Sequence, residues 1–173
     1  MNAYRYWRLL CKNVPSSSYV LLAELDLCIS GGTDVTGSGT ASASSVYSSN
    51  PIYATSNAFD NNSNTWWHSY SSPTPHWIQY DFGAGVAYEI VEYRIKGHSM
   101  AYMPSTWLLL ASDDGQYWTF KDEQNSQVWA EGETKTFAID PPLVAAVFPS
   151  SQEPVIDASH YWIHSTVDRL GVP

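Results

Sequence analysis

Apolar and polar residues alternate with a period of two along most of the first 140 residues, which predicts β-strands with one buried face. Turn residues separate these segments, and no segment keeps a helical period. Many short strands at regular spacing predict an all-β antiparallel sandwich or barrel. The expected strands are Tyr4–Cys11, Tyr19–Ile29, Ala41–Tyr47, Trp77–Phe82, Tyr88–Lys96, Thr106–Ser112, Gln116–Phe120 and Thr134–Ile139.

The pattern changes after Ile139, where Pro141–Pro142 stops the last strand. We therefore expect a sandwich over residues 1–140 and a C-terminal extension over 141–173. The extension holds a bare apolar run, Leu143–Phe148, and one more strand-like segment, Ala158–Val167. It could complete the sandwich or contact a neighbouring protein, because an exposed apolar run is typical of an interface.

Composition narrows the function classes. The chain has 173 residues, enough for one domain with a real core, and a net charge of −9. An acidic surface argues against nucleic acid and anionic membranes as partners, since both bind clustered Lys and Arg. No apolar run approaches the ~18 residues of a membrane-spanning helix.

The N-terminal residues MNAYRYWRLLCKN lack the continuous apolar core of a signal peptide. The abundance of Ser, Thr, Asn, Tyr and Trp is nevertheless typical of proteins that work outside cells. A virion component, released by lysis, would reconcile the two observations.

Two cysteines allow at most one disulfide. In its predicted strand, Cys11 alternates in step with Trp7 and Leu9 and so shares their face. Cys28 instead lies on the face opposite to the apolar residues of its own strand. The two side chains are expected to point to opposite sides, so we predict free thiols.

The segment after residue 56 concentrates oxygen-bearing side chains. Asp60, Asn62 and Asn64 recur at alternate positions and Thr65 follows, a spacing that lets a tight loop gather oxygens around Ca²⁺. Asp and Asn are also common turn residues, so a polar turn explains the spacing equally well. The match to an EF-hand loop fails, and a calcium ion would need ligands from a distant strand. Glu24 is the candidate for this distant ligand, because it lies on a predicted strand whose opposite face is apolar.

Motifs for catalysis are missing from the sequence. It contains no G-x-S-x-G, no P-loop and no G-x-G-x-x-G, and His68 and Ser69 are strand neighbours that point apart. We therefore expect a protein that is not an enzyme.

Aromatic and polar residues near strand ends suggest sugar binding, since a sugar needs a ring for its C–H face and donors for its hydroxyl rim. Packing in the core is the alternative explanation for the aromatic residues. The candidate ligand residues are His68, Tyr70, His76, Lys96, His98 and Tyr102.

Three segments together resemble the discoidin domain, the coagulation-factor type C module that also occurs as family 32 carbohydrate-binding modules. They are Ser56–Ser69 (S-x-A-F-D-x-N-x-x-T-x-W-x-S), His76–Gly83 (HWIQYDFG) and Pro104–Thr119 (P-x-x-W-x-L-x-x-S-x-D-G-x-x-W-T). The resemblance implies a jelly-roll β-sandwich of the galactose-binding-domain type, no catalysis, and a ligand site on loops at one end.

The resemblance also implies a structural Ca²⁺. Carried over to this sequence, its ligands are the carbonyls of Ala23, Asn57 and Thr65 and the side chains of Glu24, Asp60 and Asn62. Asn61 stands where the family prefers Gly, a mild departure because Asn tolerates a left-handed backbone.

Further features of the resemblance concern chain order and specificity. The segments YRYWRL and AELDL look like the family's closing strands but stand at the N-terminus, which implies a circular rearrangement. Trp67–His68–Ser69 resembles the sugar-contacting tract of galactose-binding members, with Tyr70 as the stacking ring. Those members add an arginine where this chain has only Lys96 or His98.

Segments of this kind also look similar to modules in bacteriophage tail and virion proteins. The resulting prediction is a non-catalytic carbohydrate-binding module on a phage particle that recognises host-surface glycans. The alternative is a structural virion protein that uses the sandwich and residues 141–173 to contact other virion proteins or further copies of itself.

Overall fold

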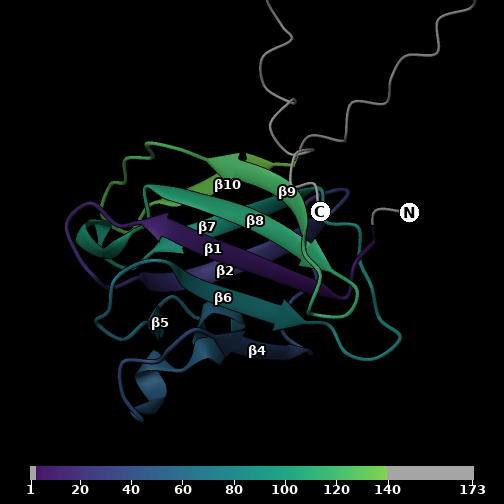
Figure 1. The fold of residues 1–173 in the computed structure, drawn as a ribbon, viewed down its shortest axis with the longest axis horizontal. Helices are drawn as coiled ribbons and strands as arrows, with labels where there is room; N and C mark the ends of the chain where they lie inside the picture. The colour runs from purple at the N-terminus through teal and green to yellow at the C-terminus, as the bar shows by residue number, and fades with distance from the viewer. Residues whose placement is uncertain (1–2, 140–173) are drawn as a thin grey trace, which may run out of the picture. The chain divides into compact units, whose positions relative to one another are not determined.

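The structure is a computed structural model that describes residues 3–139, and it consists of two antiparallel β-sheets packed face to face (Figure 1). The all-β sandwich predicted from the strand pattern is confirmed. The strands are β1 (Tyr6–Asn13), β2 (Leu21–Ile29), β3 (Thr33–Asp34), β4 (Thr40–Ala43), β5 (Trp67–His68), β6 (His76–Asp81), β7 (Glu92–Gly97), β8 (Thr106–Ser112), β9 (Thr119–Gln124) and β10 (Thr134–Ala138). The short 3₁₀ helices are η1 (Pro51–Tyr53), η2 (Thr55–Phe59) and η3 (Met100–Tyr102).

The first sheet has the strand order β4-β6-β1-β8-β9, and the second has the order β10-β7-β2-β3, with β5 paired to the start of β2. The N-terminal strands β1 and β2 therefore lie inside the two sheets rather than at their edges. In β1, Trp7 pairs with Tyr80 on one side and with Ala111 on the other.

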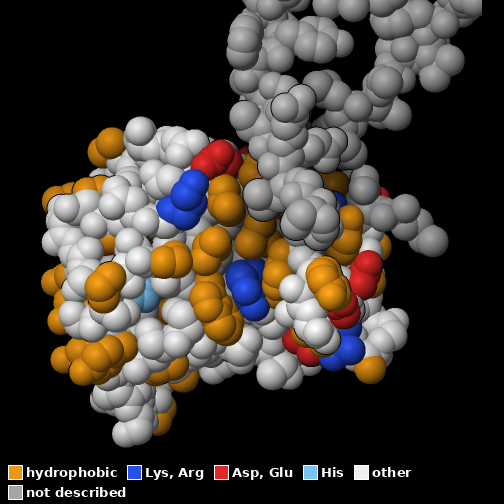
Figure 2. Space-filling model, viewed as in Figure 1, with side chains coloured by type: hydrophobic (Ala, Val, Ile, Leu, Met, Phe, Trp, Pro, Cys, Tyr) orange, Lys and Arg blue, Asp and Glu red, His pale blue; other side chains and the backbone are white. Residues whose placement is uncertain are grey.

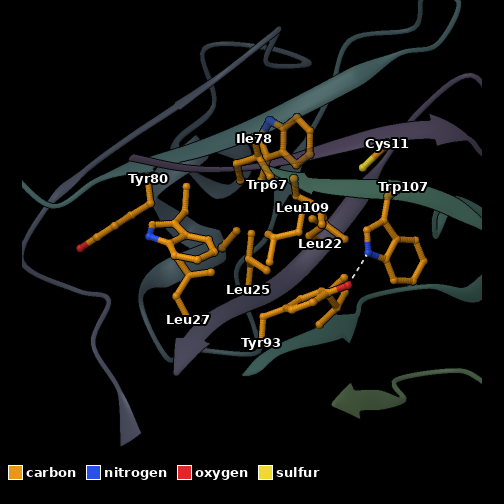
Figure 3. Packing of buried hydrophobic residues seen from close by; sticks show 14 of the residues in the cluster. Cys11, Leu22, Leu25, Leu27, Trp67, Ile78, Tyr80, Tyr93, Trp107 and Leu109 are labelled. Atoms are coloured by element: carbon orange, nitrogen blue, oxygen red, sulfur yellow. Dashed lines mark hydrogen bonds between the residues drawn. The ribbon is translucent and has the colours of Figure 1, made fainter. Parts of the chain in front are cut away.

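The core lies between the two sheets. Strict alternation along β1, β6, β7 and β8 sends every second side chain inward. Figure 3 shows side chains of the first sheet, such as Leu109 and Ile78, facing Leu22, Leu25 and Leu27 of β2. Trp67 and Trp107 are fully buried among them.

Strand β2 carries a β-bulge. In β2, Leu22 pairs with Gly97 and Glu24 with Lys96, so Ala23 has no opposite residue. The extra residue shifts the alternation, and Leu22 and Leu25 both reach the core although they are three positions apart. The Glu24 side chain consequently points to the outer side of the second sheet, where it lines a surface hollow.

The predicted strands occur at the expected places, but several bounds differ. The strand predicted at Tyr88–Lys96 begins only at Glu92, and Tyr88 forms an isolated bridge with Tyr4. The strand predicted at Gln116–Phe120 begins only at Thr119, because Asp114 Oδ1 accepts hydrogen bonds from the backbone N–H groups of Gln116 and Tyr117 and extends the turn. The strand around residues 41–47 is shorter and ends at Ala43, and the short strands β3 and β5 were not expected.

The predicted extension, residues 141–173, lies outside the described residues, as do its apolar run Leu143–Phe148 and the segment Ala158–Val167. In the part of the chain that is described, no helix has the length and apolar character to cross a membrane.

Both cysteines are free thiols, as predicted. Cys11 lies in the core between the sheets, and burial raises the pKa of its thiol to about 12. Cys28 is on the outward parity of β2, and burial raises its pKa to about 11. Both thiols therefore stay protonated at neutral pH.

A buried hydrogen-bond chain ties the sheets together. Trp107 Nε1 donates to Tyr93 Oη over 2.9 Å, drawn as the dashed line in Figure 3, and Tyr93 Oη donates to Asp122 Oδ2 over 2.6 Å. Burial is the largest cause of the raised pKa of Tyr93, and the hydrogen bond to Asp122 is the second. Since β7 belongs to one sheet and β8 and β9 to the other, this chain crosses the core.

We expect Tyr93→Phe to lower the free energy of unfolding by about 1–3 kcal/mol, because it leaves the buried Trp107 N–H without an acceptor. Urea denaturation followed by tryptophan fluorescence measures the change. Tyr117→Phe removes the same hydroxyl from a side chain that is 81% exposed, and it should change stability by less than about 0.5 kcal/mol. Equal midpoints for Tyr93→Phe and the unmodified protein would contradict the structural role of this chain.

Candidate functional site

Seven rings from separate segments meet around β5 and form what we call the aromatic cluster. Each member packs against at least one other ring of the group. The members are Tyr19, Tyr47, Tyr53, Trp66, His68, His98 and Tyr102.

His68 lies at the centre of the aromatic cluster. Its imidazole stacks on the Tyr47 ring, with 4.4 Å between centroids and 9° between planes. The rings of Tyr19 and Tyr53 each meet it edge-on at 5.2 Å. The backbone fixes this position, because His68 pairs with Leu21 at the start of β2.

The polar atoms of this cluster lack protein partners. His68 Nδ1 and Nε2 and Trp66 Nε1 are buried and make no hydrogen bond within residues 3–139. Burial, with a smaller effect from the nearby His98, lowers the pKa of His68, so the imidazole is neutral at pH 7. A neutral imidazole offers one donor and one acceptor. An unpaired buried polar group costs about 1–3 kcal/mol, and a ligand that bonded to it would recover that cost.

Three of the six predicted sugar-binding residues meet here. His98 stacks on Trp66 at 3.7 Å and 12°, and Tyr102 meets Tyr19 edge-on at 6.2 Å. With His68, these residues come from β5, from the loop after β7 and from η3. Three of the seven rings were therefore among the candidates from the sequence, whereas Tyr19, Tyr47, Tyr53 and Trp66 were not.

The other three predicted ligand residues are placed differently. His76 is 1% exposed, and its Nε2 lies 2.9 Å from the carbonyl oxygen of Ser18, so the structure corrects its role to a buried structural one. Lys96 lies on the outer face of β7 beside Glu24 and Arg94, apart from the aromatic cluster. Tyr70 is 56% exposed on the surface next to β5 and makes none of the ring contacts described above.

The second group of predicted residues surrounds the loop that follows η2. Asp60 Oδ1 accepts from the Asn62 N–H at 2.9 Å, and Asp60 Oδ2 accepts from Thr65 Oγ1 at 2.8 Å. Asn61 has a φ of 56°, the left-handed conformation anticipated from its place in the motif. Asn57 is buried, and its Nδ2 donates to the Pro51 carbonyl. The loop is thus a tight turn that is largely self-bonded.

Glu24 distinguishes this loop from an ordinary polar turn. Its side chain is 7% exposed, and neither carboxylate oxygen has a hydrogen-bond partner among the described residues. Burial, followed by the charges of Asp60 and Asp26, raises its pKa to about 7, while the nearby N–H groups of Asn61 and Asn62 oppose the rise without reaching hydrogen-bond geometry. An unpaired buried carboxylate held beside a second carboxylate fits a cation.

The donor chemistry suits calcium better than a transition metal. No three His, Cys, Asp or Glu side chains converge on one point within residues 3–139, so the available ligands are two carboxylates, amide oxygens and carbonyls. Ca²⁺ takes oxygen ligands of this kind. Ala23, in the bulge next to Glu24, has no opposite residue in β7. The predicted residues therefore fit a calcium ion.

A hollow of about 170 Å³ adjoins Glu24 on the outer side of the second sheet. Asp26, Arg94 and Lys96 line it together with Asn61. Arg94 is paired with Glu92 at 3.0 Å and lies 3.6 Å from Asp26. The approach to Glu24 is consequently bordered by charges of both signs.

The sequence model of the F5/8 type C domain matches residues 40–148. No curated protein and no solved structure shows significant similarity to the chain. The family comprises modules that bind carbohydrates or other ligands and are generally not catalytic. Because the match spans more than half of the sequence, and the two antiparallel sheets agree with it, the chain belongs to the F5/8 type C, or discoidin, domain family.

Proposed function

We propose that this protein is a non-catalytic glycan-binding module whose sugar site is centred on His68. The observation that carries the proposal is the neutral imidazole with two unpartnered nitrogens inside a ring of aromatic side chains. Apolar ring faces pair with the C–H face of a sugar, and the imidazole and indole nitrogens pair with its hydroxyl groups.

Access to His68 requires one ring to move. Both imidazole nitrogens are covered, and Tyr47 lies flat over the ring while remaining 42% exposed. Tyr47 also belongs to the loop between β4 and η1, where side chains reorient more easily than in a sheet. In the proposed mechanism Tyr47 swings away and the sugar takes its place against the imidazole.

A structural Ca²⁺ is the second part of the proposal. Glu24, Asp60 and Asn62 with the carbonyls of Ala23, Asn57 and Thr65 would hold it. The ion would neutralise two carboxylates that otherwise repel each other, and it would tie β2 to the loop that leads into β5. Display on a phage particle, where the module would recognise host-surface glycans, completes the proposal and rests on the sequence resemblance.

We expect His68→Ala to abolish sugar binding, because it removes both hydrogen-bonding nitrogens and one stacking surface. Glycan-array screening, followed by calorimetric titration with galactose, glucose and their N-acetylated forms, measures the loss. Tyr117→Ala removes an exposed aromatic ring elsewhere and should bind as the unmodified protein does. Failure of every glycan to bind, or unchanged affinity in His68→Ala, would refute the proposed site.

The calcium ion should raise the melting temperature in proportion to the logarithm of its concentration, because it binds only the folded state. Differential scanning calorimetry after EDTA treatment and at increasing CaCl₂ measures the shift. Glu24→Gln keeps the shape of the side chain but removes the charge, and we expect it to abolish most of the calcium-dependent shift. Glu123→Gln, a partly exposed carboxylate on β9, serves as the matched control. A calcium response that persists in Glu24→Gln would exclude this site.

A further inference from the structure

The outer face of the first sheet is unusually apolar. Figure 2 shows hydrophobic side chains spread over β1, β6 and β8, with a basic side chain among them. The outward positions of these strands include Leu10, Trp77, Leu108 and Leu110, all partly exposed. Arg8, in the middle of β1, is the outward residue between Tyr6 and Leu10.

Arg8 is clamped between two indoles. Its guanidinium carbon lies 4.4 Å from the ring centroid of Trp77 and 3.9 Å from that of Trp118. These rings come from β6 and from the turn before β9, on opposite sides of β1. The two cation–π contacts hold the guanidinium between the rings and shield part of it from water.

One edge of the guanidinium is occupied, and another has no hydrogen-bond partner within residues 3–139. Nε and Nη2 of Arg8 donate to Gln79 Oε1 at 3.1 and 2.7 Å. A guanidinium carries five N–H donors, so three remain, and they include both N–H groups of Nη1. The end formed by Nη1 and Nη2 is the fork that binds a carboxylate through two parallel hydrogen bonds.

Arg8 differs in this respect from the other arginines in residues 3–139. Arg5 forms a bidentate pair with Asp81, and Arg94 is paired with Glu92. No carboxylate oxygen of the described residues lies within 4 Å of Arg8, although the chain carries 17 acidic residues. Burial lowers the pKa of Arg8, and the group nevertheless stays charged at neutral pH.

We propose that Arg8, Trp77 and Trp118 form a second sugar site that takes a carboxylated sugar, independent of the site at His68. The carboxylate lies on the free fork of Arg8, the C–H face of the sugar ring packs on an outer indole face, and the Gln79 amide is available to a hydroxyl. A guanidinium that is already flat, oriented and partly dehydrated binds a carboxylate with little loss of entropy.

The overall charge restricts the ligand further. A net charge of −9 repels long polyanions, so the ligand is a single terminal uronic acid rather than a polyuronate. A protein partner that inserts an acidic residue among apolar ones would use the same fork, and the experiment below separates the two.

The test compares methyl β-D-glucuronide with methyl β-D-glucoside, two ligands that share a ring and differ in the carboxylate. ¹H–¹⁵N spectra follow the indole N–H signals of Trp77 and Trp118 during titration of the full chain. We expect saturable shifts with the glucuronide at millimolar concentration and none with the glucoside. Sodium acetate at equal concentration should produce much smaller shifts, because it lacks the ring.

Two variants connect the signal to Arg8. Arg8→Gln should weaken glucuronide binding about tenfold or more, the loss expected for charge-assisted hydrogen bonds. Gln79→Glu leaves Arg8 in place and supplies an internal carboxylate, so it should also block the ligand even if Arg8→Gln is poorly folded. Lys12→Gln removes one positive charge from the same strand, where Lys12 pairs with Glu123, and should leave binding unchanged.

The outcomes distinguish this site from the one at His68. His68→Ala should retain glucuronide binding, and Arg8→Gln should retain binding of the sugar recognised at His68. Absence of glucuronide binding, or equal binding by Gln79→Glu, overturns the proposal. Acetate shifts as large as those of the glucuronide also overturn it, since they would assign the fork to any carboxylate, including that of a protein partner.

Discussion

The bulge at Ala23 is the constraint on which both halves of the candidate site depend. Without the extra residue, β2 would keep a single alternation, and Leu22 and Leu25 could not both face the core. With it, the strand turns the Glu24 carboxylate toward the Asp60 loop while its flanking leucines stay buried. The packing of these leucines in the core therefore holds the Glu24 carboxylate in a buried position that is unfavourable for the carboxylate by itself.

The same strand also positions the aromatic cluster. Leu21 and Leu22, directly before the bulge, pair with His68 and Trp67. The loop from Asp60 to Thr65 connects η2 to this short pairing, so any ion held at Glu24 would act on the segment that carries His68. A binding site built on loops gains rigidity when its loops are tied to a central strand of the sheet.

Local patterns predicted most of the fold. The alternation in β6, β7 and β8 identified each strand and its buried face, because one side of every strand packs on the core. Contacts between distant segments could not be predicted in this way. His76 resembles a ligand residue in sequence, yet its neighbours on the strand turn it inward to Ser18. Tyr47 lies in a polar loop and Tyr53 in the short helix η1, and the local pattern of neither predicts that its ring contacts His68.

The Arg8 clamp illustrates the same limit. Trp77 and Trp118 are separated from Arg8 by about 70 and 110 positions in the sequence, and only the pairing of β1 between β6 and β8 brings the three together. The bulge could not be predicted either. The run from Val20 to Leu25 is apolar at every position except Glu24, so it shows no alternation that a bulge would interrupt. The calcium site stays a prediction, drawn from the spacing of the motif rather than from the strand pattern.

The central place of β1 has a consequence for how the molecule forms during synthesis. Residues 6–13 leave the ribosome before both of their pairing partners, β6 and β8, which end about 70 and 100 residues later. The apolar strands β1 and β2 therefore wait with open edges until most of the domain has emerged. Topology of this kind gives slow folding, and the interval before β8 arrives is when the nascent chain is most open to aggregation or chaperone capture.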